Sequence, residues 1–240
     1  MALVFSRDLL RPLQGTHIHA ALDSALTKAS AALPTAGLDF VRQMREFLSV
    51  RFGPHKTYRA HREMIDRATR AIHDRRTVQM RYHSASSGKT GRREVDPYHL
   101  WYAAGGLYLI GYCHRRRDVR MFAVERIRSL TSTDHPYQLP LGFDVEAYVQ
   151  DAFVVMRGGR QIAAELVFDR ATAAWARDRV WHPSQELAPL RDGRLRMTLR
   201  VADTRELVGW ILSFGRGVKV LRPAELRDRV RQEALALARH

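Results

Sequence analysis

Residues 96–130 read DPYHLWYAAGGLYLIGYCHRRRDVRMFAVERIRSL, and this stretch decides the fold of the chain. It contains three short apolar runs, separated by a Gly-Gly pair and by the basic segment at residues 114–118. Short apolar runs bounded by turn residues are typical of a β-meander. We therefore expect three consecutive antiparallel strands here.

Aromatic and basic residues alternate along the second and third runs. Alternate side chains of an extended chain lie on one face, so Tyr108, Ile110 and Tyr112 are expected to share a face. If residues 119–126 are extended throughout, they also place four side chains on one face: Arg120, Phe122, Val124 and Arg126. Guanidinium groups bind phosphate or carboxylate in a planar fork, and tyrosine rings stack on bases. Such a surface suits a ligand that is flat and anionic.

Several motifs of this region resemble the WYL domain, a family named for a Trp-Tyr-Leu triplet. Three segments resemble the core of that domain: Gly106-Leu107-Tyr108-Leu109, in which Leu107 stands in place of the Trp, Asp118-Val119-Arg120-Met121-Phe122, and Glu125-Arg126-Ile127. Further matches lie upstream at Tyr82-His83-Ser84, Arg93 and Asp96-Pro97. Trp181-His182-Pro183-Ser184-Gln185 and Leu212-Ser213-Phe214-Gly215 resemble the C-terminal extension, WCX, that accompanies many WYL domains.

The resemblance implies a bacterial transcriptional regulator. In that family an N-terminal winged helix-turn-helix binds DNA, and an Sm-like or SH3-like β-barrel senses an effector, which in some members is single-stranded DNA. We expect this chain to start after the winged helix, so that DNA is bound through a missing or separate winged-helix domain. The expected fold class is α+β, with a helical connector or dimerisation segment at 1–75, the barrel at 76–135, a linker with one short helix at 136–159, and the C-terminal extension at 160–240.

From these residues and this resemblance we predict one ligand site. Seven side chains are expected to converge on one face or mouth of the barrel and to bind an anionic effector, a nucleotide or single-stranded nucleic acid: Tyr82, Ser84, Arg93, Tyr108, Arg120, Phe122 and Arg126. Two structural explanations compete with this prediction. The tyrosines can be core residues with satisfied hydroxyl groups, and Arg120 and Arg126 can be ion-pair partners of Glu125 or Glu94.

The composition limits the class of protein. With 240 residues, 45% of them hydrophobic, the chain can bury a core and hold two small domains. Its formal charge of +15 suggests polyanionic partners, although a GC-rich genome that favours Arg explains the same total. No run reaches the length of a membrane span, residues 1–10 lack a signal-peptide pattern, and the single cysteine fits a reducing compartment. We expect a cytoplasmic protein that does not contact membranes.

The first third of the sequence predicts helices. Thr16 can cap a helix that Pro34 stops. A second apolar stripe comprises Phe40, Val41, Met44, Phe47 and Leu48. A third helix is expected at residues 58–75. Because the connection between the first two helices contains Pro34 and Gly37, we favour a connector or dimerisation bundle over a helix-turn-helix.

The β region begins at residues 77–84, where apolar and polar side chains alternate. The loop that follows contains Gly88-Lys89-Thr90, which imitates the end of a phosphate-binding P-loop. The first glycine of that motif would fall at His83, and no helix pattern follows. We therefore exclude nucleotide hydrolysis at this loop.

Residues 160–240 predict strands and helices in the order β-α-β-β-α-β plus a terminal helix, which is ferredoxin-like. Asp169 is expected to cap the first helix, Asp192-Gly193 to turn a hairpin, and Asp203 with Glu206 to form a capping box. One sheet face is expected to be open and lined by Arg194, Arg196 and Arg200.

No pattern in the sequence indicates catalysis. His17 and His19 stand two residues apart, which on a helix points them in divergent directions, so we predict no metal and no cofactor. Cys113 and His114 are adjacent on a strand and face opposite ways, so we predict that the chain is not an enzyme. Two alternatives to a sensor remain: a constitutive Sm-like nucleic-acid-binding protein, and an accessory partner that dimerises and joins a separate DNA-binding subunit.

Overall fold

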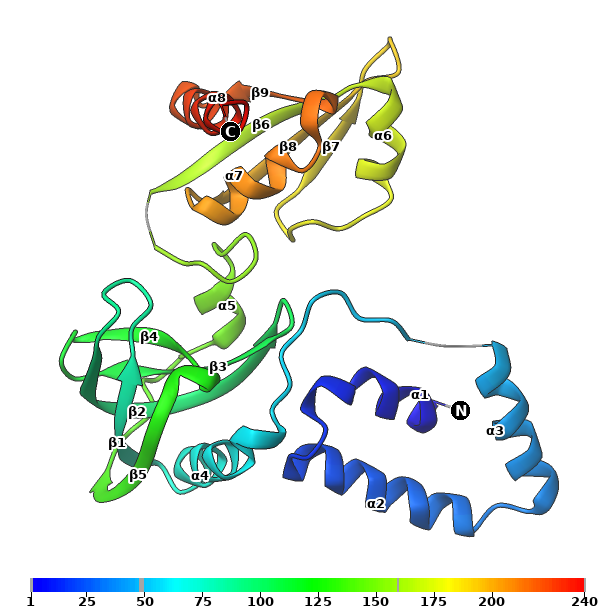
Figure 1. Cartoon of the computed structure of the whole chain (residues 1–240), viewed down its shortest axis with the longest axis vertical. Helices are drawn as coiled ribbons and strands as arrows, with labels where there is room; N and C mark the ends of the chain where they lie inside the picture. Colours follow the sequence, from blue (N-terminus) through cyan, green and yellow to red (C-terminus); the bar gives the residue numbers. More distant parts are fainter. Residues whose placement is uncertain (1, 48–49, 159, 240) are drawn as a thin grey trace. The chain divides into compact units, whose positions relative to one another are not determined.

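The computed structural model describes residues 2–47, 50–158 and 160–239. The chain divides between Leu141 and Gly142 into two compact units, which Figure 1 shows in blue to green and in light green to red. Both units combine helices with an antiparallel sheet. The α+β class expected from the sequence is therefore observed.

The first unit begins with three helices: α1 (Ala2–Leu9), α2 (His17–Ala31) and α3 (Thr35–Phe47), with a short 3-10 turn at Arg11–Leu13. The Thr16 hydroxyl accepts a hydrogen bond from the backbone N–H of His19, so the predicted cap is confirmed. Of the second predicted apolar stripe, Phe47 is exposed. Its other members lie outside the residues whose side chains are described: Phe40, Val41, Met44 and Leu48.

Five antiparallel strands follow the helix α4 (Arg62–His73). They are β1 (Arg76–His83), β2 (Thr90–Ala103), β3 (Gly106–Cys113), β4 (Asp118–Ala123) and β5 (Ile127–Pro136), in the sheet order β4-β3-β2-β1-β5. The predicted meander is confirmed, since β2, β3 and β4 are consecutive neighbours. The first half of the long strand β2 pairs with β1 and its second half with β3, across a register shift between Pro97 and His99.

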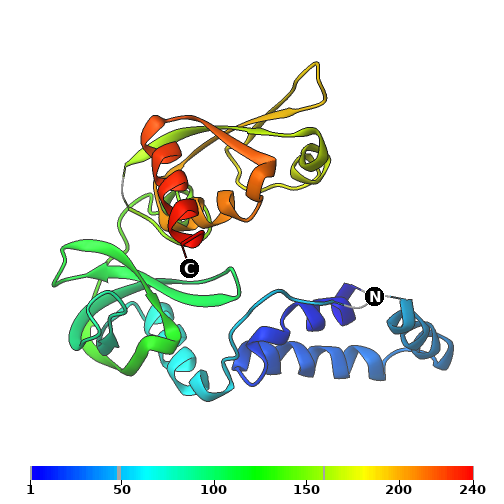
Figure 2. The ribbon, with the colours of Figure 1, turned by 45° about the horizontal axis from the view of Figure 1, so that its top comes forward.

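One core fills the concave side of this sheet. Strand residues such as Val78, Met80, Leu109, Phe122 and Leu130 pack together with two alanines of α4. Helix α4 lies against β1, β2 and β5 (Figures 1 and 2). The side chains that alternate with these core residues therefore point outward.

A second cluster attaches the N-terminal segment to the sheet. Tyr58, Leu107 and Val124 are buried side by side with Leu13 and Ile65. The Tyr58 hydroxyl accepts a 2.6 Å hydrogen bond from the backbone N–H of Leu107. Burial raises the pKa of Tyr58. Leu107, which stands at the Trp position of the family triplet, is thus a core residue held by the segment that precedes α4.

The third apolar run is not extended throughout, contrary to the expectation for residues 119–126. Strand β4 ends at Ala123, and Val124–Arg126 form a 3-10 turn. The turn places Val124 in the cluster around Tyr58, where only 1% of its surface is exposed. The strand alternation therefore does not continue from Phe122 to Arg126.

The second unit contains α5 (Val145–Val149) and a four-stranded antiparallel sheet. Its elements follow the predicted order: β6 (Gln161–Phe168), α6 (Arg170–Arg177), β7 (Glu186–Pro189), β8 (Leu195–Ala202), α7 (Arg205–Leu212), β9 (Val218–Arg222) and α8 (Ala224–Leu237). The sheet order is β7-β8-β6-β9, and α7 and α8 pack side by side (Figure 2). Asp144 caps α5, and Asp169 caps α6 as its sequence position predicted.

The predicted capping box before α7 is wrong. Thr204 occupies the N-cap position and makes no side-chain cap. Oε2 of Glu206 instead accepts hydrogen bonds from the backbone N–H groups of Val155 and Met156, at 2.9 and 2.7 Å. Asp203 pairs with Arg229. Both carboxylates are used for contacts with distant parts of the chain.

The end of the expected linker at 136–159 belongs to the second unit. Phe153 is buried in that unit's core, and Asp151 accepts a hydrogen bond at its carbonyl from the N–H of Ala202. The backbone N–H groups of Val155 and Met156 donate to Glu206, as described above. Residues 151–156 are thus a packed loop rather than a free joint.

The three arginines expected to line an open sheet face are exposed, and each is paired with a carboxylate. Each is within 3.2 Å of a carboxylate oxygen: Arg194 with Asp192, Arg196 with Glu165 and Arg200 with Glu186. The face is therefore close to charge balance at these positions, which the arginine spacing alone did not reveal.

Candidate ligand site

A pocket of about 310 Å³ opens at one end of the first sheet. We call it the arginine pocket and define it by its lining residues: Tyr82, Ser84, Arg93, Cys113, Arg116, Arg120, Met121 and Phe122. Five of the seven residues predicted from the sequence lie here: Tyr82, Ser84, Arg93, Arg120 and Phe122. They come from β1, β2 and β4 and from the loop after β1.

The pairing of β3 with β4 explains how Arg120 and Phe122 reach this pocket. Phe122 is opposite Leu109, and Arg120 is opposite Gly111. Residues directly opposite each other share a face, and Leu109 is a core residue, so this is the concave face. Gly111 has no side chain, and the backbone of Asp96 occupies the position that its Cβ would take. Phe122 therefore forms the floor of the pocket and Arg120 stands farther out.

Tyr82 combines a structural role with an exposed position. Its ring meets that of Phe122 edge to face, with the centroids 5.1 Å apart. Its hydroxyl accepts a 3.3 Å hydrogen bond from the backbone N–H of Ala123. The ring is nevertheless only half-buried and lines the pocket. The hydroxyl proton remains available as a donor to a ligand.

Three guanidinium groups surround these aromatic rings. Arg120 pairs with Asp118, with Nε 3.1 Å from Oδ2, and more than half of each side chain is exposed. Such exposed pairs contribute about 1 kcal/mol or less, so an anion can compete for Arg120. Among the described residues, Arg93 and Arg116 have no carboxylate partner. Arg93 donates from Nη1 to the carbonyl of Arg92.

The turn between β3 and β4 positions Arg116. The carbonyl of Cys113 accepts hydrogen bonds from the N–H groups of Arg116 and Arg117, at 2.9 and 2.8 Å. The start of the turn is held by His114, whose Nε2 lies 2.9 Å from Oδ1 of the buried Asp96. A tight turn closed in this way returns Arg116 toward the strands.

Tyr108 and Arg126 do not belong to this pocket, so their predicted convergence with the other five residues is wrong. Tyr108 is adjacent to the core residue Leu109 on β3 and therefore lies on the opposite face of the sheet. There its ring approaches that of its cross-strand partner Trp101, with centroids 6.1 Å apart. Arg126 lies in the 3-10 turn after β4 and not on the strand that carries Arg120.

Sequence reasoning missed Cys113, Arg116 and Met121. The chain turns that bring them together gave no periodic signal, because the pocket is formed where β3 ends and β4 begins.

Within the described ranges, no group of three or more His, Cys, Asp or Glu side chains could hold a metal ion. Among those same ranges, no helix has the length and apolar character that crossing a bilayer requires.

Comparison with known proteins identifies two domains. The WYL domain model matches residues 63–132, and the WCX domain model matches residues 160–238. The HTH-type transcriptional regulator YobV of Bacillus subtilis is 30% identical over 167 residues, which are 65% of this chain and 49% of YobV. PafB of Mycobacterium tuberculosis is 29% identical over 175 residues, which are 70% of this chain and 52% of PafB.

One solved structure has a related fold. A CRISPR Cas-related protein matches 74% of this chain and 50% of its own, with a TM-score of 0.51 and 10% sequence identity. At that identity the similarity concerns the fold alone. The chain spans about half the length of the curated relatives it matches.

Proposed function

Because this chain belongs to the WYL-domain family, with a WYL domain followed by a WCX domain, we propose that it is the effector-sensing part of a transcriptional regulator. The effector is an anionic ligand, a nucleotide or single-stranded nucleic acid, bound in the arginine pocket. Binding is transmitted to DNA binding or to oligomerisation. DNA is contacted through a winged-helix domain outside this chain, the active form is a homodimer, and the function requires neither catalysis nor a cofactor.

The single observation that carries this proposal is the composition of the arginine pocket. Arg93, Arg116 and Arg120 surround the aromatic pair of Tyr82 and Phe122. Guanidinium groups form charge-assisted hydrogen bonds with phosphate oxygens, and an exposed aromatic edge or face can contact a base. Asp118 is the one carboxylate in contact with these arginines among the described residues. An anionic ligand is the natural complement of such a pocket.

We also propose the finer fold assignments. A helix followed by five bent antiparallel strands supports an Sm-like barrel for 76–135, and the strand order β7-β8-β6-β9 supports a ferredoxin-like extension for 160–240. In this arrangement α4 contacts both the sheet and, through Asp66, the ring of His17 on α2. A change at the barrel can therefore reach the N-terminal helices.

The test is fluorescence anisotropy with labelled single-stranded (dT)12, using the wild type, Arg120→Ala and Arg115→Ala. Loss of one charge-assisted contact of about 1.5 kcal/mol corresponds to about a tenfold weaker affinity for Arg120→Ala. Arg115 carries the same charge on the adjacent turn but does not line the pocket. The control variant is therefore expected to bind within about twofold of the wild type.

Equal losses in both variants would show that binding follows total charge and would contradict a defined site. Light scattering with and without (dT)12 then separates a sensor from a constitutive binder. A sensor must have different affinities in its two states, so its assembly or conformation shifts on binding. Unchanged scattering and unchanged circular dichroism would favour the constitutive binder.

A further inference from the structure

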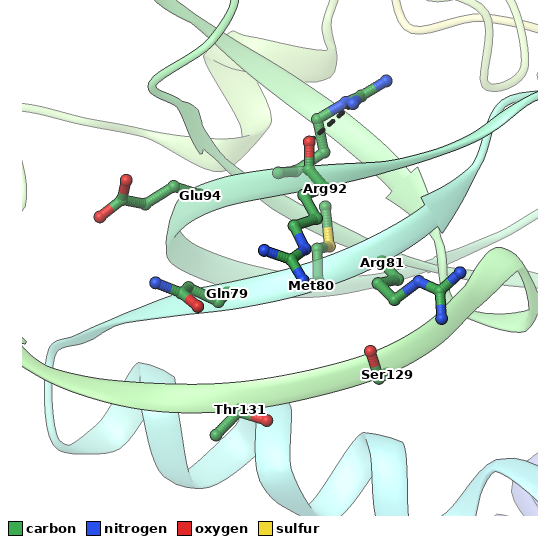
Figure 3. Close-up of a pocket in the computed structure, with 8 residues that line it drawn as sticks. Gln79, Met80, Arg81, Arg92, Glu94, Ser129 and Thr131 are labelled. Atoms are coloured by element: carbon green, nitrogen blue, oxygen red, sulfur yellow. Dashed lines mark hydrogen bonds between the residues drawn. The ribbon is translucent and has the colours of Figure 1, made fainter.

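A second basic depression lies on the outer, convex face of the sheet in the first unit. It has a volume of about 490 Å³ and is formed by outward side chains of β1, β2 and β5 (Figure 3). We call it the outer groove and define it by its lining residues: Gln79, Met80, Arg81, Arg92, Arg93, Glu94, Ser129 and Thr131. Figure 3 shows Arg81 and Arg92 projecting from adjacent strands, with Ser129 and Thr131 along the neighbouring strand.

Arg81 and Arg92 are directly opposite each other on β1 and β2. The carbonyls of Arg92 and Glu94 accept hydrogen bonds from the Arg93 side chain and from the N–H of His114, so they point away from β1. The Arg81–Arg92 pair is consequently a non-hydrogen-bonded one, in which Cβ atoms are closest, at about 4.5–5.5 Å. Two like charges in this position destabilise a sheet.

Nothing in the described part of the chain neutralises this pair. Arg81 and Arg92 form no ion pair there, although both are exposed. Glu94 faces Gln79 at one end of the groove and lies beyond 4.0 Å from either guanidinium group. Along the β5 side of the groove, Thr131 opposite Gln79 and Ser129 opposite Arg81 offer hydroxyl groups as donors. A shallow surface with two unpaired guanidinium groups and neutral donors fits the repeated phosphates of a nucleic-acid strand.

The outer groove adjoins the arginine pocket at Arg93, which lines both. On the side away from β1, the pairing of β2 with β3 begins only at Val95. The edge of β2 is therefore open at Arg92 and Arg93. Among the residues that the structure describes, no neighbouring strand separates the two depressions at this edge.

We infer that the outer groove binds the sugar-phosphate backbone of the same single strand that occupies the arginine pocket. The strand passes over the open edge of β2, with Arg93 between the two contacts. The effector is then an oligonucleotide of several nucleotides rather than a mononucleotide. This inference rests on the function proposed above, because it names the ligand class of that site.

The test compares (dT)12 with dTMP, using the full chain and the double variant Arg81→Gln/Arg92→Gln. We expect the variant to bind (dT)12 at least about tenfold more weakly and to bind dTMP as the wild type does. The slope of log affinity against log salt should fall by about 1.4, since each phosphate of a single strand contributes about 0.7. The melting temperature should stay the same or rise, because the variant removes a repulsive pair.

The matched control is Arg194→Gln/Arg222→Gln, which removes two charges that are each paired with a carboxylate in the second unit. It should change (dT)12 affinity by less than about twofold. If the outer-groove variant binds (dT)12 as the wild type does while Arg120→Ala does not, the inference is refuted and the proposed function stands. If only the outer-groove variant loses affinity, the arginine pocket is not the effector site. A loss equal to that of the control also refutes the outer groove.

Discussion

The hydroxyl of Tyr58 joins the segment before α4 to the start of β3, and its removal makes a sharp test of this architecture. Tyr58 is fully buried, and its oxygen lies 2.6 Å from the backbone nitrogen of Leu107. The substitution Tyr58→Phe keeps the ring and deletes the acceptor. The N–H of Leu107 is then left buried without its partner.

The magnitude follows from that unsatisfied donor. Burying a donor without a partner costs about 1–3 kcal/mol. For a unit of this size, 1 kcal/mol corresponds to about 4 °C in melting temperature. We therefore expect Tyr58→Phe to lower the melting temperature of the first unit by about 4–12 °C.

Differential scanning calorimetry measures this change, and Tyr102→Phe is the matched control. Tyr102 packs against the same cluster, but its buried hydroxyl has no hydrogen-bond partner among the described residues. Removing an unsatisfied polar group leaves stability unchanged or raises it. The reasoning is refuted if the two substitutions lower the melting temperature equally, or if Tyr58→Phe has no effect.

Three further predictions concern packing, the loop at residues 151–156 of the second unit, and pH. Gly111→Ala would place a Cβ 2.4 Å from the carbonyl oxygen of Asp96, so we expect the free energy of unfolding in urea to fall by about 1–3 kcal/mol. The control is Gly209→Ala, whose new Cβ would meet no described heavy atom within 4 Å beyond its chain neighbours and its own helix backbone, so it should stabilise α7. Equal effects of the two substitutions would contradict the stated contact. Glu206→Ala removes the acceptor of two backbone N–H groups, so limited proteolysis should cut residues 151–158 faster than in the wild type, and an unchanged rate would argue against this anchor. Burial lowers the pKa of His182 below its ordinary 6.5, so the unfolded chain takes up a proton first as the pH falls. The contribution of His182 to the free energy of unfolding is therefore present above about pH 6.5 and is lost as the pH falls below it. Between about pH 7.5 and 5.5, the melting temperature should fall by less in His182→Gln than in the wild type. Identical falls would exclude this histidine as the cause.

The sequence predicted local structure well where one residue fixes a backbone geometry. Thr16 and Asp169 cap their helices as expected, because a side-chain oxygen at the N-cap satisfies N–H groups one turn later. The meander around Gly105-Gly106 was equally clear. These signals depend on neighbouring residues only.

Prediction failed where distant contacts decided the outcome. The chain turns after Ala123 because Val124 is drawn into the cluster around Tyr58, and this removed Arg126 from the face of Arg120. Tyr108 was assigned to the wrong face because alternation within one strand does not say which face is concave. Glu206 looked like a helix cap but binds a loop some fifty residues away in the sequence.

The opposed pair of Arg81 and Arg92 was also invisible in the sequence. It exists only in the observed register of β1 and β2, and a shift by one residue would separate the two side chains onto different faces. Arg116 likewise reaches the arginine pocket only because the carbonyl of Cys113 closes the turn. Candidate sites that join several strands require the register before their members can be named.

Photochemical cross-linking tests the central claim most directly, namely that the ligand enters the concave face of the first sheet. The full chain is irradiated with a 5-iodouracil-substituted single-stranded oligonucleotide, and the modified peptides are identified by mass spectrometry. We predict cross-links at Tyr82, whose half-buried ring lines the arginine pocket. Cross-links confined to Tyr108 and Trp101, on the opposite face, would contradict the account.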